Sequence, residues 1–190
     1  MVTRADGKKK SEFLAQTSVL SGSYFDYVVN GTNYRISYTD LLAALDIRSK
    51  VQQGGLLSMQ DNATVTAIAS IATPVRVGGV WASVSADSMT ASTSGRLTYD
   101  LSDSRVLSIG ADLTIAPSAG SAQAVSVYIA KNGAVISGSR IATTISTSAP
   151  LAVSTQWRMT FELGDYVEVF VQNATATNSL VVSRAVLRVN

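Results

Sequence analysis

Apolar and polar residues alternate along much of the chain after residue 60. Residues 107–115 give the clearest case, because all of their odd-numbered positions are apolar. A period of two predicts a β-strand with one buried face. Turn residues such as Gly164-Asp165 interrupt the pattern at short intervals. We therefore predict roughly eight to ten short strands and an all-β sandwich or jelly roll of two sheets.

The last third of the chain predicts three strands, over residues 157–163, 166–172 and 180–189. In the second of these, the valines at 167, 169 and 171 form one face. Its other face carries Tyr166 and Phe170 beside polar residues. A strand with one buried face should be polar there, so these two aromatics predict a second burial. Either another subunit or long loops of the same chain would cover them.

Two earlier segments carry further strand and turn signals. The odd positions of residues 63–71 are apolar, which predicts a strand that Pro74 brings to an end. Lys131-Asn132-Gly133 predicts a hairpin with a type I′ turn, because Asn and Gly both tolerate positive φ.

The N-terminal quarter divides differently. Residues 1–12 lack apolar periodicity and contain Lys8 to Lys10, so we expect a flexible basic tail, either solvated or docked on an acidic partner. Residues 13–48 predict a compact module: a hairpin around Asn30-Gly31, then a short helix that begins near Thr39-Asp40 and contains several leucines. We expect residues 49–58 to form a linker, because Gly54-Gly55 gives the chain freedom there, and residues 59–190 to form the head.

Composition restricts the functional classes. Hydrophobic residues make up 46% of the 190 residues and charged residues 15%, which indicates an ordered protein. The net charge of +2 gives no argument for nucleic-acid binding. No apolar run reaches the roughly 20 residues of a membrane helix, and the N-terminus has no hydrophobic signal core. We therefore expect no membrane insertion and no signal-directed export.

Candidate chemistry is sparse. The chain has neither Cys nor His, which removes disulfides, thiolates and the commonest general base. Glu162, Asp165 and Glu168 lie close in sequence but read as turn and surface charges rather than a glycosidase pair. The aspartates at 61, 100 and 103 lack the spacing of a calcium loop. We expect no enzyme activity, cofactor or metal, with a polysaccharide depolymerase as the enzymatic alternative.

Three motifs carry a resemblance to a known family. They are residues 163–169 (Leu-Gly-Asp-Tyr-Val-Glu-Val), 95–99 (Gly-Arg-Leu-Thr-Tyr) and 129–133 (Ile-Ala-Lys-Asn-Gly). Together they resemble the tumour-necrosis-factor-like jelly roll, which also forms the heads of complement-type trimers and has viral and phage versions. The resemblance spans residues 60–190 and implies a homotrimer. On that basis we expect Tyr166, Phe170 and Tyr128 at the trimer interface.

The N-terminal module carries a second resemblance. Its strand, Asn-Gly turn, strand and Thr-Asp-Leu-Leu-Ala stretch resemble a module near the N-termini of bacteriophage tail-fibre and related virion proteins. There the module lies at the end nearest the particle, so the resemblance implies that residues 1–48 bind another virion protein of the capsid, portal, neck or tail. The expected anchoring residues are Tyr24, Phe25, Tyr27, Leu41, Leu42 and Leu45.

These resemblances lead to one hypothesis and one main alternative. The hypothesis is a virion protein of a bacteriophage, made in the host cytoplasm: a trimeric fibre, spike or head fibre whose exposed loops contact host-surface glycans or protein. The alternative is a capsid or neck decoration protein that stabilises the particle and binds no receptor.

Overall fold

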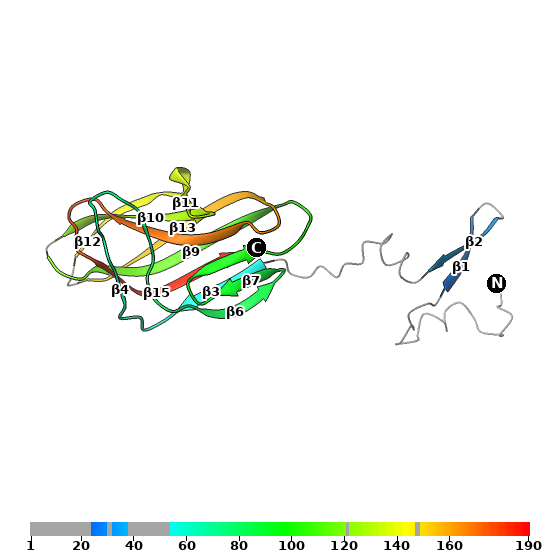
Figure 1. Cartoon of the computed structure of the whole chain (residues 1–190), viewed down its shortest axis with the longest axis horizontal. Coiled ribbons are helices and arrows are strands. Elements are labelled where there is room, and N and C mark those ends of the chain that lie inside the picture. Colours follow the sequence, from blue (N-terminus) through cyan, green and yellow to red (C-terminus); the bar gives the residue numbers. More distant parts are fainter. Residues whose placement is uncertain (1–23, 30–31, 38–53, 121, 147–148) are drawn as a thin grey trace. The chain divides into compact units, whose positions relative to one another are not determined.

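The computed structural model describes residues 24–29, 32–37, 54–120, 122–146 and 149–190 (Figure 1). The chain forms two compact units, Met1–Lys50 and Val51–Asn190, and each is described here by itself. In the first unit, β1 (Tyr24–Val29) pairs antiparallel with β2 (Thr32–Ser37). Val29 pairs with Thr32, so two residues separate the strands, as the Asn-Gly signal predicts. The predicted hairpin is therefore confirmed.

Most of the expected anchor lies outside the described part of the chain. This applies to the tail 1–12, to the helix expected near 41–46 with its three leucines, and to the side chains of Phe25 and Tyr27. The side chain of Tyr24 is 55% exposed, and the Arg35 guanidinium carbon lies 5.6 Å from its ring centre.

The second unit consists of two antiparallel sheets that form a jelly roll, which confirms the predicted fold class. In the six-stranded sheet the path is β13-β9-β15-β3-β6, with β4 paired to β15. In the seven-stranded sheet the path is β11-β10-β14-β8-β7, with β12 paired to β10 and β5 to β14. The strands are β3 (Gly54–Met59), β4 (Val65–Thr66), β5 (Val75–Arg76), β6 (Ala82–Asp87), β7 (Met89–Ser92), β8 (Arg96–Tyr99), β9 (Arg105–Pro117), β10 (Gln123–Lys131), β11 (Ala134–Val135), β12 (Ile141–Ile145), β13 (Leu151–Phe161), β14 (Tyr166–Asn173) and β15 (Leu180–Val189).

Strand β9 is an interior strand of the six-stranded sheet and lies between β13 and β15 (Figure 1). Its odd positions from Leu107 to Ile115 are buried, as the alternation predicts. In β15 a bulge between Val182 and Arg184 shifts the register by one residue. The bulge keeps Val182 and Ala185 on the core side although they are three residues apart, and it places Arg184 on the outward face.

The core lies between the two sheets and is aliphatic with a few aromatics. Trp81, Tyr99 and Phe161 are among its largest fully buried side chains, and the rings of Tyr99 and Phe161 lie 5.8 Å apart. Gly95 adopts a φ of +86° directly over Trp81, where an added Cβ would come within 2.6 Å of the indole nitrogen. The Gly95 position therefore needs glycine both for its backbone conformation and for the packing of Trp81.

The expected linker over 49–58 is wrong from residue 54 onward. Residues 54–59 form β3, which lies between β15 and β6 in the six-stranded sheet. Leu57 is fully buried in the core. The Gly54-Gly55 pair indicated freedom, but glycine also permits close approach: a Cβ on Gly55 would come within 2.8 Å of a Leu97 methyl carbon. The head therefore begins before residue 59.

The strand expected over 63–71 is also wrong in extent and in phase. Only Val65–Thr66 and, further on, Val75–Arg76 are strands in this region. Thr66 and Ile68 are buried, whereas Val65 and Ile71 are about half exposed. The segment passes from β15 in one sheet to β14 in the other. Because the segment bridges two sheets, its buried positions follow no single period. The buried Thr66 hydroxyl accepts a hydrogen bond from the Gly78 N–H.

Two of the sequence motifs meet at one end of the sandwich through Asp165. Its carboxylate accepts hydrogen bonds from Asn132 Nδ2 at 2.7 Å and from the Glu162 N–H at 2.8 Å, and it pairs with Lys131 Nζ at 2.6 Å. The turn at 131–133 has positive φ at Asn132 and Gly133, as predicted. Burial acts to raise the pKa of Asp165, but the hydrogen bonds from Lys131, Asn132 and Glu162 together outweigh it and lower the pKa. The carboxylate thus ties two hairpin turns together.

We expect Asp165→Asn to lower the free energy of unfolding at pH 7 by about 1.5–3 kcal/mol, the usual contribution of hydrogen bonds to a charged group. Because the pKa of Asp165 is lower in the folded than in the unfolded state, its contribution is present above about pH 4 and is lost as the pH falls further. Urea unfolding at pH 7 and at about pH 2.5 should therefore show a gap between wild type and variant that closes in acid. Glu162→Gln, in the same turn but exposed, is the control. An equal gap at both pH values would contradict the assignment.

Candidate functional site

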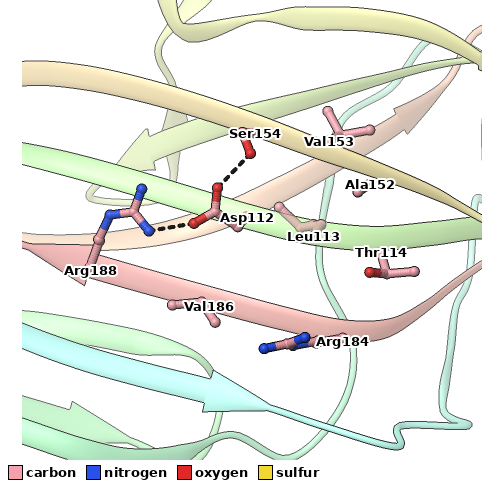
Figure 2. A pocket seen from close by; sticks show the side chains of 9 residues that line it. All are labelled: Asp112, Leu113, Thr114, Ala152, Val153, Ser154, Arg184, Val186 and Arg188. Atoms are coloured by element: carbon pink, nitrogen blue, oxygen red, sulfur yellow. Dashed lines mark hydrogen bonds and ion pairs between the residues drawn. The ribbon is translucent and has the colours of Figure 1, made fainter.

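The outward face of the six-stranded sheet contains a groove of about 370 Å³ (Figure 2). We call this surface the groove face. It consists of outward side chains of β9, β13 and β15, and its members are Asp112, Thr114, Ala152, Ser154, Arg184, Val186 and Arg188. They are exposed or half-buried, because the same strands direct their alternate side chains into the core.

An ion pair lies at one end of the groove. Arg188 binds the Asp112 carboxylate, and Ser154 Oγ donates a hydrogen bond of 2.5 Å to the other carboxylate oxygen (Figure 2). Arg188 reaches Asp112 by lying across Gly110, its partner on the neighbouring strand. A Cβ on Gly110 would come within 2.7 Å of Arg188 Nε. A side chain at position 110 would therefore displace the Arg188 guanidinium from its place over the sheet.

The Ser154 hydrogen bond is the largest influence on the pKa of Asp112 and lowers it. Burial opposes this effect, and Arg188 adds to it. Asp112 therefore stays ionised and paired at neutral pH. A low pKa does not suit a general acid, and the carboxylate has no second acid beside it in the groove.

The remaining groove side chains are small, apolar or cationic. Arg184 lies at the other end, near Thr114, where the β15 bulge directs it outward (Figure 2). A second groove of about 240 Å³ lies beyond Arg188, between the ends of β3, β6 and β15. Val106, at 54% exposure, extends the apolar part of this side of the sheet. The arrangement suits contact with another protein surface better than chemistry on a small molecule.

The described residues offer no metal centre. Among them, no three Asp or Glu side chains are grouped so as to hold an ion. The three carboxylates at 162, 165 and 168 separate in space: Asp165 binds the turns, Glu162 is exposed, and Glu168 is buried between two arginines. Across the same described residues, no helix is long and apolar enough to cross a bilayer.

The expected trimer-interface residues lie on the outward face of the other sheet. Tyr128 pairs with Phe170 across β10 and β14. Tyr128 is only 7% exposed, and its hydroxyl donates a 2.7 Å hydrogen bond to Gln172. The Arg96 guanidinium carbon lies 3.8 Å from the ring centre of Tyr166. Much of the second burial thus comes from the same chain, and the interface role of these residues stays a prediction.

The sequence pattern did not indicate the groove face. The polar positions of its alternating strands are occupied by Asp112, Ser154 and Arg188. From the sequence alone, such residues are interpreted as ordinary solvent-exposed side chains. The one available signal was Gly110 inside the most regular strand pattern, because glycine in a strand interior often marks a close approach by another group.

No protein-family model and no curated protein matches the sequence. Among solved structures, murine APRIL at pH 8.5 is 13% identical, with 73% of this chain and 99% of that chain covered and a TM-score of 0.46. The PRD1 vertex protein P5 is 13% identical, with 74% and 97% covered and a TM-score of 0.47. The globular domain of zebrafish complement 1qA is 16% identical, with 72% and 95% covered and a TM-score of 0.36. These likenesses agree with the jelly-roll fold and carry no argument about function.

We expect Ser154→Ala to raise the pKa of Asp112 toward its ordinary value of about 3.9, because the variant removes the strongest of the hydrogen bonds that lower it. The measurement is an NMR titration of the side-chain carboxyl carbon. Ser108→Ala is the control, since Ser108 is exposed on the same face of β9 and makes no side-chain bond to Asp112 in the described structure. An unchanged pKa in Ser154→Ala would show that Arg188 alone controls this carboxylate.

Proposed function

We propose that the chain is a structural protein of a bacteriophage particle, a homotrimeric fibre or spike subunit that contacts the host surface. In this proposal, residues 1–48 attach the subunit to another virion protein, and the head projects outward. The motifs of the head and of the N-terminal hairpin support the virion and trimer assignments. The division of the chain into two compact units agrees with separate anchoring and projecting parts.

One observation from the structure carries the self-association part of the proposal. One face of the six-stranded sheet is buried in the core. In the described part of the chain, the side chains of the groove face are exposed or half-buried, so this face is available to another subunit. Small residues such as Ala152 and Ser154 let another backbone approach closely, and Val106 and Val186 add apolar contact. In a ring of three identical chains the contacts are head-to-tail, so the groove face of each subunit would contact a different patch of the next subunit.

The groove face is better placed for this role than the expected aromatics. Tyr128 has little side-chain area left to bury against a partner, and Tyr166 is already covered on one side by Arg96. We therefore place the self-association surface on the six-stranded sheet and keep the aromatic face as the competing site to be tested.

We expect the full chain in solution to have three times the mass of one chain by light scattering. Ala152→Arg should shift it to monomer, because a charged side chain would be buried at each of three equivalent contacts. Ala142→Arg is the matched control: Ala142 is also an exposed alanine on an edge strand, but on the outward side of the seven-stranded sheet. A trimer that survives Ala152→Arg and dissociates with Ala142→Arg would assign the interface to the aromatic face. A monomeric wild type would remove the trimer.

We expect deletion of residues 1–48 to abolish incorporation into particles of a phage that encodes the chain, while the head stays folded by circular dichroism. Quantitative immunoblotting of purified particles gives the occupancy. Normal occupancy of the truncated protein would contradict the anchoring role. The decoration alternative predicts a different result: particles that lack the protein would adsorb to the host as well as particles that contain it, but would be less stable to heat.

A further inference from the structure

The outward face of the seven-stranded sheet carries an arginine pair built on a buried carboxylate. Glu168 lies on β14 with only 3% of its side chain exposed. Its Oε1 accepts hydrogen bonds from Arg76 Nη1 at 3.0 Å and from Arg96 Nη2 at 3.2 Å. Arg76 comes from β5 and Arg96 from β8, so three strands converge on a single oxygen atom.

Together with Glu168, the two arginines have a net charge of +1. One arginine in a bidentate arrangement would neutralise Glu168, yet two guanidiniums share the same oxygen. Two cations against one carboxylate leave one positive charge uncompensated. Arg76 and Arg96 remain 44% and 37% exposed, so both still present N–H donors to the solvent.

Both guanidiniums are positioned by contacts within the chain. Each of them donates a hydrogen bond to Glu168. The Arg96 guanidinium carbon also lies 3.8 Å from the centre of the Tyr166 ring. Positioning in advance reduces the rotamer entropy that an arginine loses when it binds a ligand. The buried Glu168 carboxylate therefore positions two exposed guanidiniums.

Aromatic and further cationic groups continue across the same face. Phe170 is the direct cross-strand neighbour of Arg76, and Tyr128 is the neighbour of Phe170. At the far side, Arg140 donates from Nε to the Ser126 hydroxyl at 3.0 Å, just before β12 begins. The backbone positions of Arg76 and Arg140 are thus separated by three strand spacings, about 14 Å. The half-buried Phe170 lies between them as an apolar floor.

We propose that this surface, made of Arg76, Arg96, Phe170 and Arg140, binds an anionic polysaccharide through its acid groups. Guanidinium forks match carboxylate and phosphate oxygens alike, and an aromatic floor suits the C–H face of a sugar ring. The backbone positions of Arg76 and Arg140 lie about 14 Å apart across the sheet, and a repeating polymer can contact both side chains with successive residues. The inference rests on the proposed host contact and names the chemistry of that contact. In a trimer, three such surfaces would multiply a weak affinity.

The test uses the full-length protein and two anionic probes, polygalacturonate for carboxylates and dextran phosphate for phosphates, with neutral dextran as the blank. Binding is measured by biolayer interferometry at low salt and at physiological salt. We expect one or both anionic probes to bind, and the stronger of the two identifies the acid group. Arg76→Gln and Arg96→Gln should each weaken binding about 10-fold or more, the loss expected for a hydrogen bond to a charged group.

The test also needs a folding check, a control variant and defined contrary outcomes. Each single variant leaves Glu168 paired with the remaining arginine, so the head should still fold, which thermal melting checks. Arg158→Gln removes the same charge from the outward side of the six-stranded sheet and should leave binding within about twofold of wild type. Absence of binding to both anionic probes, or an equal loss in Arg158→Gln, overturns the proposal. A fall in oligomer mass in Arg96→Gln also overturns it, because the arginines would then serve a protein interface.

The outcome separates this inference from the proposed virion role. Loss of particle incorporation on deletion of residues 1–48 tests the role of the chain in the particle and does not involve Arg76 or Arg96. Polysaccharide binding by the purified protein tests only the arginine surface.

Discussion

The head depends on the burial of two sheet faces against each other. Strand β9 is central to this constraint, because its long ladders to β13 and β15 fix which side of three strands faces the core. Once the odd residues from Leu107 to Ile115 are inside, Asp112 and Gly110 must face outward. The same condition on β14 buries its valines and turns Glu168 and Phe170 toward the other surface. The two candidate surfaces are thus the outer sides of one packing arrangement.

The sequence was sufficient for the parts of the fold that repeat with a period of two. Strands β9 and β14, the 131–133 turn and the N-terminal hairpin follow from alternation and turn chemistry alone. Strand β15 was also predicted, but not the bulge that shifts its register between Val182 and Arg184. Period-two reasoning failed where the chain leaves one sheet for the other, as at Thr66 and Ile68. It also failed at Gly54-Gly55, because two glycines indicate freedom in a linker and close approach in a sheet, and only the packed neighbour distinguishes the two.

Neither surface could be derived from the sequence, because each depends on partners far apart in the chain. Arg76, Arg96 and Glu168 lie on three strands, and nothing local indicates that their side chains converge on one oxygen atom. Arg188 and Asp112 meet only because β15 pairs with β9 in one register, with Gly110 between them. The aromatics at 166 and 170 did indicate an unusual second face, but the sequence could not say that arginines of the same chain cover part of it.

The place where the head begins has a mechanical consequence. Residues 54–59 enter the head as β3, an interior strand bonded to β15 on one side and to β6 on the other. If the head is held at its outer surfaces, tension transmitted through the preceding residues acts along the axis of β3. Such a force loads both rows of backbone hydrogen bonds in shear, so that they resist together instead of opening one after another. An interior first strand therefore gives a tethered head a connection that withstands pulling.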